Sequence, residues 1–206
     1  MEILAGLLVG LPGFVVELFG WRKAVAALAL LVAGHAGAQV LALTFDDGLN
    51  PDTQPQARAW NAQLLANLRE TRVVSMVFPA LVRTGDGAGR DLIANWSAGG
   101  HDVGNHTSRH RSLGSARVPL DAFVQDVMEA DAAFRTLPTW QPRIRFPYLK
   151  EGETAAKRDG FRTWMKANGY APAPVSIDTS DWYYDQSYRA LAGAGDEARR
   201  AALQAL

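Results

Sequence analysis

Short apolar runs alternate with longer amphipathic stretches along the chain from about residue 40 onward. The short runs, most of them closed by glycine, proline or aspartate, predict strands at residues 40–45, 73–78, 101–105, 143–146 and 175–178. Stretches with apolar residues at helical spacing predict helices at residues 51–70, 90–98, 120–137, 153–168 and 186–192. This alternation predicts repeated βα units, and therefore an α/β protein with a mostly parallel sheet.

Two of the predicted helices have a clear apolar face. In the helix at 51–70, Trp60, Leu64 and Leu68 lie on one side. The apolar stripe of the helix at 120–137 contains Leu120, Phe123, Val124, Val127 and Phe134. Because the core-facing side of a surface helix is the apolar one, these are the residues we expect to be buried.

The first 38 residues have the features of an export signal. The basic pair Arg22 and Lys23 precedes an apolar run, and small residues follow it up to Ala38. Cleavage after Ala38 would leave one domain at residues 39–206, so we expect a periplasmic or secreted protein. The alternative is an uncleaved N-terminal extension that contacts the membrane, although each apolar run is short for a span of about 20 residues.

Residues 1–20 allow two further interpretations. They are either an extension upstream of the natural start or the first arm of a membrane hairpin. The glycines and the proline within this apolar stretch do not separate the two.

Composition excludes several classes of function. Lys and Arg together number 21, as do Asp and Glu, so the net charge is zero. A neutral chain lacks the basic excess that nucleic-acid binding requires. Cysteine is absent, which excludes disulfides, thiolate metal ligands and cysteine nucleophiles. Of four histidines, three lie within ten residues of one another, at His101, His106 and His110.

The polar residues that could bind a ligand or take part in a reaction follow the predicted strands. In parallel α/β sheets, binding and catalysis gather at the carboxyl ends of the strands. The segments found at these ends are Asp46-Asp47, His106 to His110, Arg145 and Asp178 to Asp181. We therefore expect them to form one site.

Asp46, Asp47 and the histidine pair have the composition of a metal site. Adjacent carboxylates repel each other unless a cation neutralises part of their charge, and one can bind metal while the other faces substrate. His106 and His110, four residues apart, can meet on one side of a turn and chelate one divalent ion. Two histidines and a carboxylate form a common zinc site. The alternatives are a solvated Asp-Gly turn and surface histidines.

The remaining candidates could support that chemistry. Arg145 is a permanent cation that can hold a carboxylate ionised, and the alternative is a surface ion pair. The Tyr148 amide could point into the site. Asp181 and Trp182 add a carboxylate and an aromatic plane, unless they are a helix-capping acid and a core tryptophan. His101, next to Gly99-Gly100, is interpreted as a structural or surface histidine.

Together these segments resemble the NodB-homology polysaccharide deacetylases of carbohydrate esterase family 4. The family motifs are TFDDG, H-[ST]-x-x-H, R-x-P-[YFW] and D-x-x-D-W. The matching segments, in the same order, are Thr44–Gly48, His106–His110, Arg145–Tyr148 and Asp178–Trp182. Four ordered matches are a specific pattern. The resemblance implies a distorted (β/α) barrel with its site at the strand ends.

The resemblance also implies roles for the acids and histidines. Asp46 would be the catalytic base, and Asp47, His106 and His110 would hold one divalent metal ion. Zinc is the expected ion, with cobalt or nickel possible.

The resemblance implies supporting roles for four other residues. Arg145 would hold Asp46, and Asp181 would support Arg145. The Tyr148 amide would donate to the oxyanion, and Trp182 would form a wall of the acetyl pocket.

The sequence departs from the family towards its end. A later L-x-H motif would supply the acid for the leaving group, but no histidine follows His110. Residues 196–206 have the composition of a helix and not of a last barrel strand. We therefore expect a truncated chain that lacks the last strand and is poorly active.

The sequence predicts metal-dependent hydrolysis of N- or O-linked acetyl groups from a polysaccharide or oligosaccharide. One alternative is a hydrolase that cuts the C–N bond of a small non-sugar amide on the same scaffold. Another is a catalytically weak domain that binds metal and saccharide. A metallophosphoesterase is a weaker alternative, since only one histidine pair is available for a two-metal site.

Overall fold

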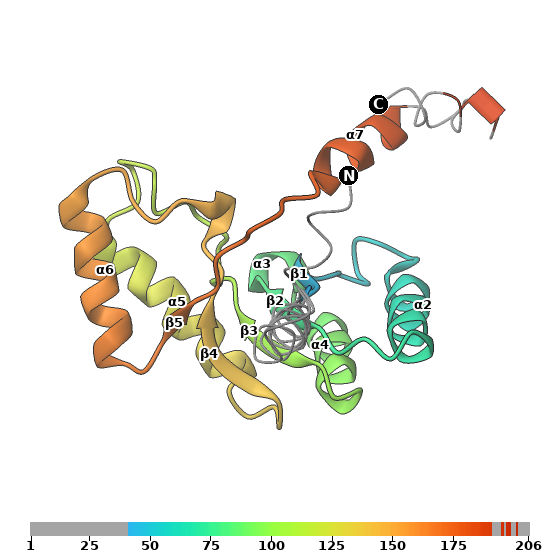
Figure 1. Cartoon of the computed structure of the whole chain (residues 1–206), viewed down its shortest axis with the longest axis horizontal. Helices are drawn as coiled ribbons and strands as arrows, with labels where there is room; N and C mark the ends of the chain where they lie inside the picture. The colour runs from blue at the N-terminus through green and yellow to red at the C-terminus, as the bar shows by residue number, and fades with distance from the viewer. Residues whose placement is uncertain (1–40, 191–194, 196, 199–200, 202–206) are drawn as a thin grey trace, which may run out of the picture. The chain divides into compact units, whose positions relative to one another are not determined.

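The computed structural model describes residues 41–190 together with 195, 197, 198 and 201 (Figure 1). The chain divides into two units, residues 1–42 and 43–206, and the elements below belong to the second. The expected export signal at 1–38 lies outside the described residues. Within the part that is described, no helix is both long and apolar enough to span a membrane.

Strands and helices alternate as the sequence predicts. The strands are β1 (Thr44–Asp47), β2 (Met76–Pro79), β3 (Asp102–Asn105), β4 (Trp140–Ile144) and β5 (Ala171–Pro172). The helices are α2 (Ala57–Glu70), α3 (Leu81–Thr84), α4 (Ala88–Ala98), α5 (Leu120–Phe134), α6 (Ala155–Ala167) and α7 (Asp181–Ala190), with a 3-10 turn η1 (Pro147–Leu149).

The five strands form one parallel sheet in the order β1-β2-β3-β4-β5. The predicted α/β class and parallel sheet are therefore confirmed. Each strand adjoins the next one in sequence, which is the order of successive strands in a (β/α) barrel. Because all strands run the same way, their carboxyl ends meet at one edge, and this brings together the candidate residues at the end of β1 and those that follow β3 and β4.

Two apolar clusters cover the sheet. α5 and α6 enclose one of them, in which Phe123, Phe146 and Phe161 contact one another ring to ring. The other lies among β2, β3, α2 and α4 and includes Trp96 and Val103. The predicted stripe of α5 faces the core, because its members are buried or half-buried. The strand ends are thus mounted on a packed scaffold.

The predicted strand at 175–178 is wrong. The strand next to β4 is β5, whose two residues pair with Arg143 and Ile144. The chain reaches β4 directly after the turn at Gly169, which has a φ of +73°. Residues 175–178 come after that short pairing has ended and belong to no strand.

The first predicted strand and helix are displaced. β1 begins at Thr44 and includes both acids, which places Asp46 and Asp47 on the strand itself. α2 begins at Ala57 because residues 51–56 form turns. The expected burial of Trp60 is also wrong, since that residue is 49% exposed. Leu68 is buried and Leu64 is half-buried, as expected, and the buried side of α2 also carries Asn61, whose Oδ1 accepts a hydrogen bond from Trp96 Nε1 at 2.8 Å.

His101 is a structural residue. It is buried beside Trp96, with 5.4 Å between the ring centroids, and its Nδ1 accepts a hydrogen bond from the Ser75 amide at 3.3 Å. This acceptor role requires an unprotonated Nδ1. Burial lowers the pKa of His101 below its usual value.

We expect His101 to stabilise the fold in a pH-dependent way. A histidine with a lowered folded pKa contributes stability that is present above the unfolded pKa of about 6.5 and is lost as the pH falls. The unfolding free energy of the parent should therefore exceed that of His101→Gln by more at about pH 7.5 than at about pH 5.5. Urea titrations of both proteins at the two pH values measure this gap. A gap that widens on acidification contradicts the assignment.

Candidate metal and catalytic site

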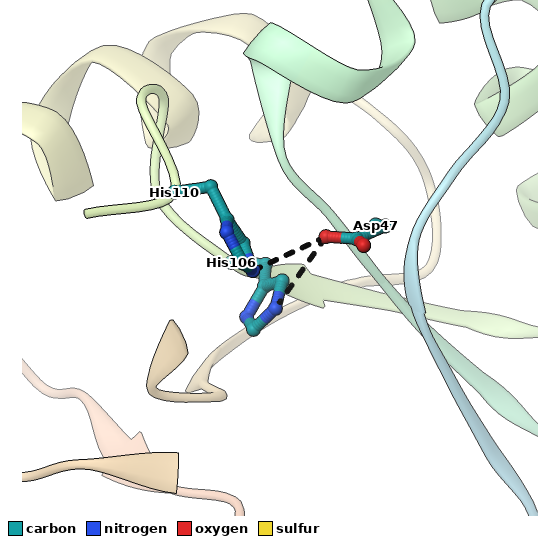
Figure 2. A group of neighbouring side chains, drawn as sticks. All are labelled: Asp47, His106 and His110. Carbon is teal, nitrogen blue, oxygen red and sulfur yellow. Dashed lines mark ion pairs between the residues drawn. The ribbon is translucent and has the colours of Figure 1, made fainter. Parts of the chain in front are cut away.

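Asp47, His106 and His110 converge at the carboxyl end of the sheet (Figure 2). Asp47 Oδ1 lies 3.8 Å from His106 Nε2 and 3.3 Å from His110 Nε2. The two imidazole rings face this carboxylate from the loop that follows β3, with their centroids 4.8 Å apart. The structure therefore brings together the three residues expected to bind a metal.

The backbone at these residues is unusual. Asp47, Thr107 and His110 have φ values of +72°, +70° and +51°, in the left-handed region that residues other than glycine rarely occupy. Such conformations cost about 1–3 kcal/mol each and tend to occur at functional sites. Here they turn the Asp47 carboxylate and the histidine loop towards each other.

His106 is oriented by a hydrogen bond on the far side of its ring. Its Nδ1 lies 2.7 Å from the backbone carbonyl oxygen of Arg145. A carbonyl oxygen only accepts, so Nδ1 carries the proton and Nε2 presents a lone pair to Asp47. Metal-binding histidines are commonly held in this way. Burial lowers the pKa of both His106 and His110, which favours the neutral form that binds metals.

These three residues fit a divalent metal ion. Asp47 Oδ1 is buried yet has no hydrogen-bond partner among the described residues. A buried polar atom without a partner is costly, and a cation would satisfy it. Atoms bound to one tetrahedral zinc ion at about 2.0–2.2 Å lie roughly 3.4 Å apart, close to the separations at Asp47 Oδ1.

The segment after β2 fixes both halves of this cluster. The amides of Leu81 and Val82 donate to the carbonyls of Thr107 and Ser108, at 3.3 and 2.8 Å. The Ala80 amide donates to the Asp47 carbonyl at 3.0 Å. β1 and the histidine loop are therefore held by one short stretch of backbone.

Asp46 points to a different partner, the buried side chain of Arg145. Arg145 Nη1 lies 3.0 and 3.2 Å from the two carboxylate oxygens of Asp46. The same guanidinium donates to Thr44 Oγ1 at 3.1 Å and to the Ala173 carbonyl at 2.7 Å. Burial raises the pKa of Asp46, and Arg145 opposes this shift. The two adjacent acids thus have different partners: Arg145 for Asp46, and the two histidines for Asp47.

Tyr148 lies beside the cluster, whereas Asp181 forms no ion pair there and acts only as a nearby negative charge that helps to raise the pKa of Asp46. The Tyr148 ring centroid is 4.9 Å from that of His110, and its φ is +59°. Asp181 does not contact Arg145: its carboxylate accepts the Trp182 amide at 2.9 Å. Trp182 is 59% exposed, and its ring contacts Tyr183.

Arg83 is a neighbour of the site that sequence reasoning missed. Its Nε lies 3.9 Å from Asp47 Oδ2. Arg83 follows β2 in α3, so the rule that chemistry gathers after parallel strands would have indicated it. This residue adds positive charge next to the Asp47 carboxylate.

A sequence profile of the polysaccharide deacetylase family matches residues 33–164. The chain belongs to the polysaccharide deacetylase family. The match includes Asp46, Asp47, both histidines and Arg145, but it ends before Asp181. The resemblance drawn from the motifs is therefore confirmed at the level of the family.

Two curated relatives are chitooligosaccharide deacetylases. The one from Bradyrhizobium sp. (strain ANU 289) is 32% identical over 149 residues, which is 71% of this chain and 60% of the relative. The one from Sinorhizobium fredii (strain NBRC 101917 / NGR234) is 35% identical over 148 residues, which is 71% of this chain and 61% of the relative. This chain thus spans about 60% of the length of these relatives.

A solved structure supports the same fold. The chitin deacetylase from the fungal pathogen Colletotrichum lindemuthianum aligns with a TM-score of 0.55 and 25% sequence identity. The alignment covers 69% of this chain and 58% of the fungal one.

We expect His106→Ala to remove most of the metal that the protein binds. The substitution deletes one of three donors, and weaker changes around a metal site already cost about 10–100-fold in affinity. Zinc per chain after dialysis against trace zinc measures the loss. His101→Ala, which removes a buried histidine outside the cluster, is the control. Equal zinc content in His106→Ala and the parent would refute the metal site.

Proposed function

We propose that this chain is the catalytic part of a metal-dependent deacetylase that acts on an N- or O-acetylated saccharide. The observation that carries the proposal is the pairing of two different acids at one strand end. Asp47 belongs to a metal-binding cluster, and the adjacent Asp46 is held apart from it by Arg145. Family membership and the chitooligosaccharide deacetylase relatives support the reaction.

Asp47, His106 and His110 would hold one divalent ion, for which zinc is the first candidate. When bound, such an ion supplies a Lewis acid that polarises the acetyl carbonyl and makes a water molecule more acidic. The chain's own contribution is to fix the donor atoms. The Arg145 carbonyl holds the His106 ring, and the Ala80 amide holds the Asp47 backbone.

Asp46 is the proposed general base. Its Oδ2 lies 4.0 Å from His106 Nε2, so the carboxylate borders the space in front of the donor cluster. There it can accept a proton from a water that attacks the acetyl carbon. Burial raises the pKa of Asp46 and makes it a stronger base, while Arg145 keeps it ionised and oriented. The same carboxyl is also the proposed proton donor to the leaving nitrogen or oxygen, because no histidine follows His110 in this sequence to supply the acid expected from the L-x-H motif.

The Tyr148 amide is proposed to donate a hydrogen bond to the oxygen that becomes negative during attack. The left-handed conformation of Tyr148 and its contact with the His110 ring place this residue at the rim of the site. A backbone donor held by η1 needs no reorganisation as the charge develops.

The proposed substrate is an oligosaccharide or polysaccharide that contains N-acetylated glucosamine units. The curated relatives are named for chitooligosaccharides, and the fungal structure is that of a chitin deacetylase. The neutral net charge of this chain suits a neutral glycan.

The two acids should fail in different ways when each is changed to asparagine. Asp46→Asn cannot accept a proton, so acetate release should fall by about 10²–10⁴-fold while zinc binding is kept. Asp47→Asn should weaken zinc binding and recover part of its activity at high zinc. The assay measures acetate released from N-acetylated chitooligosaccharides and from an O-acetylated glycan, together with zinc titration.

Two results would count against the proposed function. Identical zinc affinities and rates in the two variants would show that the acids do not divide the work. Absence of acetate release by the zinc-loaded natural protein from both substrate types would remove the deacetylase assignment.

A further inference from the structure

A series of hydrogen-bonded polar side chains, half-buried at Tyr170 and Asp131 and buried at Asn105, lies behind the histidine loop. Tyr170, just before β5, donates its hydroxyl to Asp131 Oδ1 of α5 at 2.8 Å. The same hydroxyl is 3.2 Å from Nδ2 of Asn105, the last residue of β3. Asn105 is fully buried and directly precedes His106. None of these three side chains has a role in the proposed reaction.

The hydrogen bonds that link Asp131, Tyr170 and Asn105 have one possible direction. An ionised Asp131 only accepts, so the Tyr170 hydroxyl donates to it and must accept from Asn105 Nδ2. The second hydrogen of that amide goes to the Val127 carbonyl at 2.9 Å. Both N–H groups of the Asn105 side chain are thereby used. Its Oδ1 accepts a hydrogen bond from the Thr107 amide at 2.8 Å.

Thr107 transmits this constraint to the proposed metal ligands. It lies between His106 and His110, is fully buried, and has a φ of +70°. A β-branched residue in that region is strained and keeps the conformation only when its surroundings impose it. Its Oγ1 accepts the His110 amide at 3.0 Å. The side-chain oxygen of Asn105 therefore holds the backbone of Thr107, and the Thr107 hydroxyl in turn holds the backbone of His110.

We propose that Tyr170 and Asp131 are positioning residues, which hold the His106–His110 loop in its metal-binding conformation through Asn105. The effect on metal affinity rests on the proposed function, whereas the effect on the loop does not. Burial and the Asp131 carboxylate both raise the pKa of Tyr170, so the phenol stays protonated. Asp131 also pairs with Arg135, at 3.3 Å from its Nε. Removal of the Arg135 contact therefore provides a control, because it changes the same carboxylate without removing the Tyr170 hydroxyl.

Two variants test the proposal without removing bulk from the core. Tyr170→Phe deletes only the hydroxyl, and Asp131→Asn keeps the shape but loses the fixed direction. Amide hydrogen exchange of Thr107 and His110 in the metal-free protein should accelerate about 10-fold in both. Zinc affinity, measured by competition with a chelating dye, should fall about 10-fold or more.

Arg135→Gln and Tyr184→Phe are the matched controls. Arg135→Gln removes the other partner of Asp131, and Tyr184→Phe removes an exposed phenol of α7. Both should keep the parental exchange rates and zinc affinity.

Exchange at Thr107 and His110 decides the proposal even if the parent binds no zinc, a result that would count against the proposed function alone. Parental exchange in both variants, with a lower unfolding free energy in urea, would show a merely structural network and overturn the proposal. If Tyr170→Phe does not fold, Asp131→Asn gives the same decision.

Discussion

The buried guanidinium of Arg145 is the interaction on which the site depends. Arg145 is 4% exposed, and its side chain reaches from the end of β4 to Thr44 and Asp46 of β1, and to the carbonyl of Ala173 beyond β5. It also lies over the ring of Phe78, 4.6 Å from the centroid. A buried charge is costly unless it is paired and fully hydrogen-bonded. That requirement fixes these distant segments of the sheet relative to one another.

The backbone of Arg145 adds a second constraint. Its carbonyl sets the tautomer of His106, while its side chain holds Asp46. One residue therefore presents a neutral imidazole to the proposed metal and keeps the neighbouring carboxylate for proton transfer. The positive charge also opposes the effect of burial on the pKa of Asp46. Adjacent acids acquire different chemistry because only one of them has this partner.

The sequence predicts the parallel α/β sheet and most of the cluster at its carboxyl edge. Strand-helix alternation and residue spacing suffice for Asp47, His106 and His110, because parallel strands bring their ends together. Local patterns could not show that Trp60 is exposed, nor that β5 would pair before residue 175. Both depend on tertiary packing, which overrides local periodicity.

The hydrogen bonds that hold the histidine loop also could not be predicted from the sequence. Tyr170 and Asn105 are 65 residues apart, and no spacing rule connects them. The left-handed backbone of Thr107 depends on contacts between residues that are distant in the sequence, so the local sequence does not predict it. The position of Asp181 after a predicted strand and the resemblance both led us to expect a contact with Arg145. In the structure, the guanidinium is satisfied by Thr44, Asp46 and Ala173 instead.

Anomalous X-ray scattering from crystals of the zinc-loaded protein tests the central claim most directly. The account predicts one strong zinc peak within bonding distance of Asp47, His106 and His110, with Asp46 still paired to Arg145. A zinc ion bound by Asp46, or a zinc-loaded site in which Asp46 has left Arg145, would contradict the division of roles between the two acids.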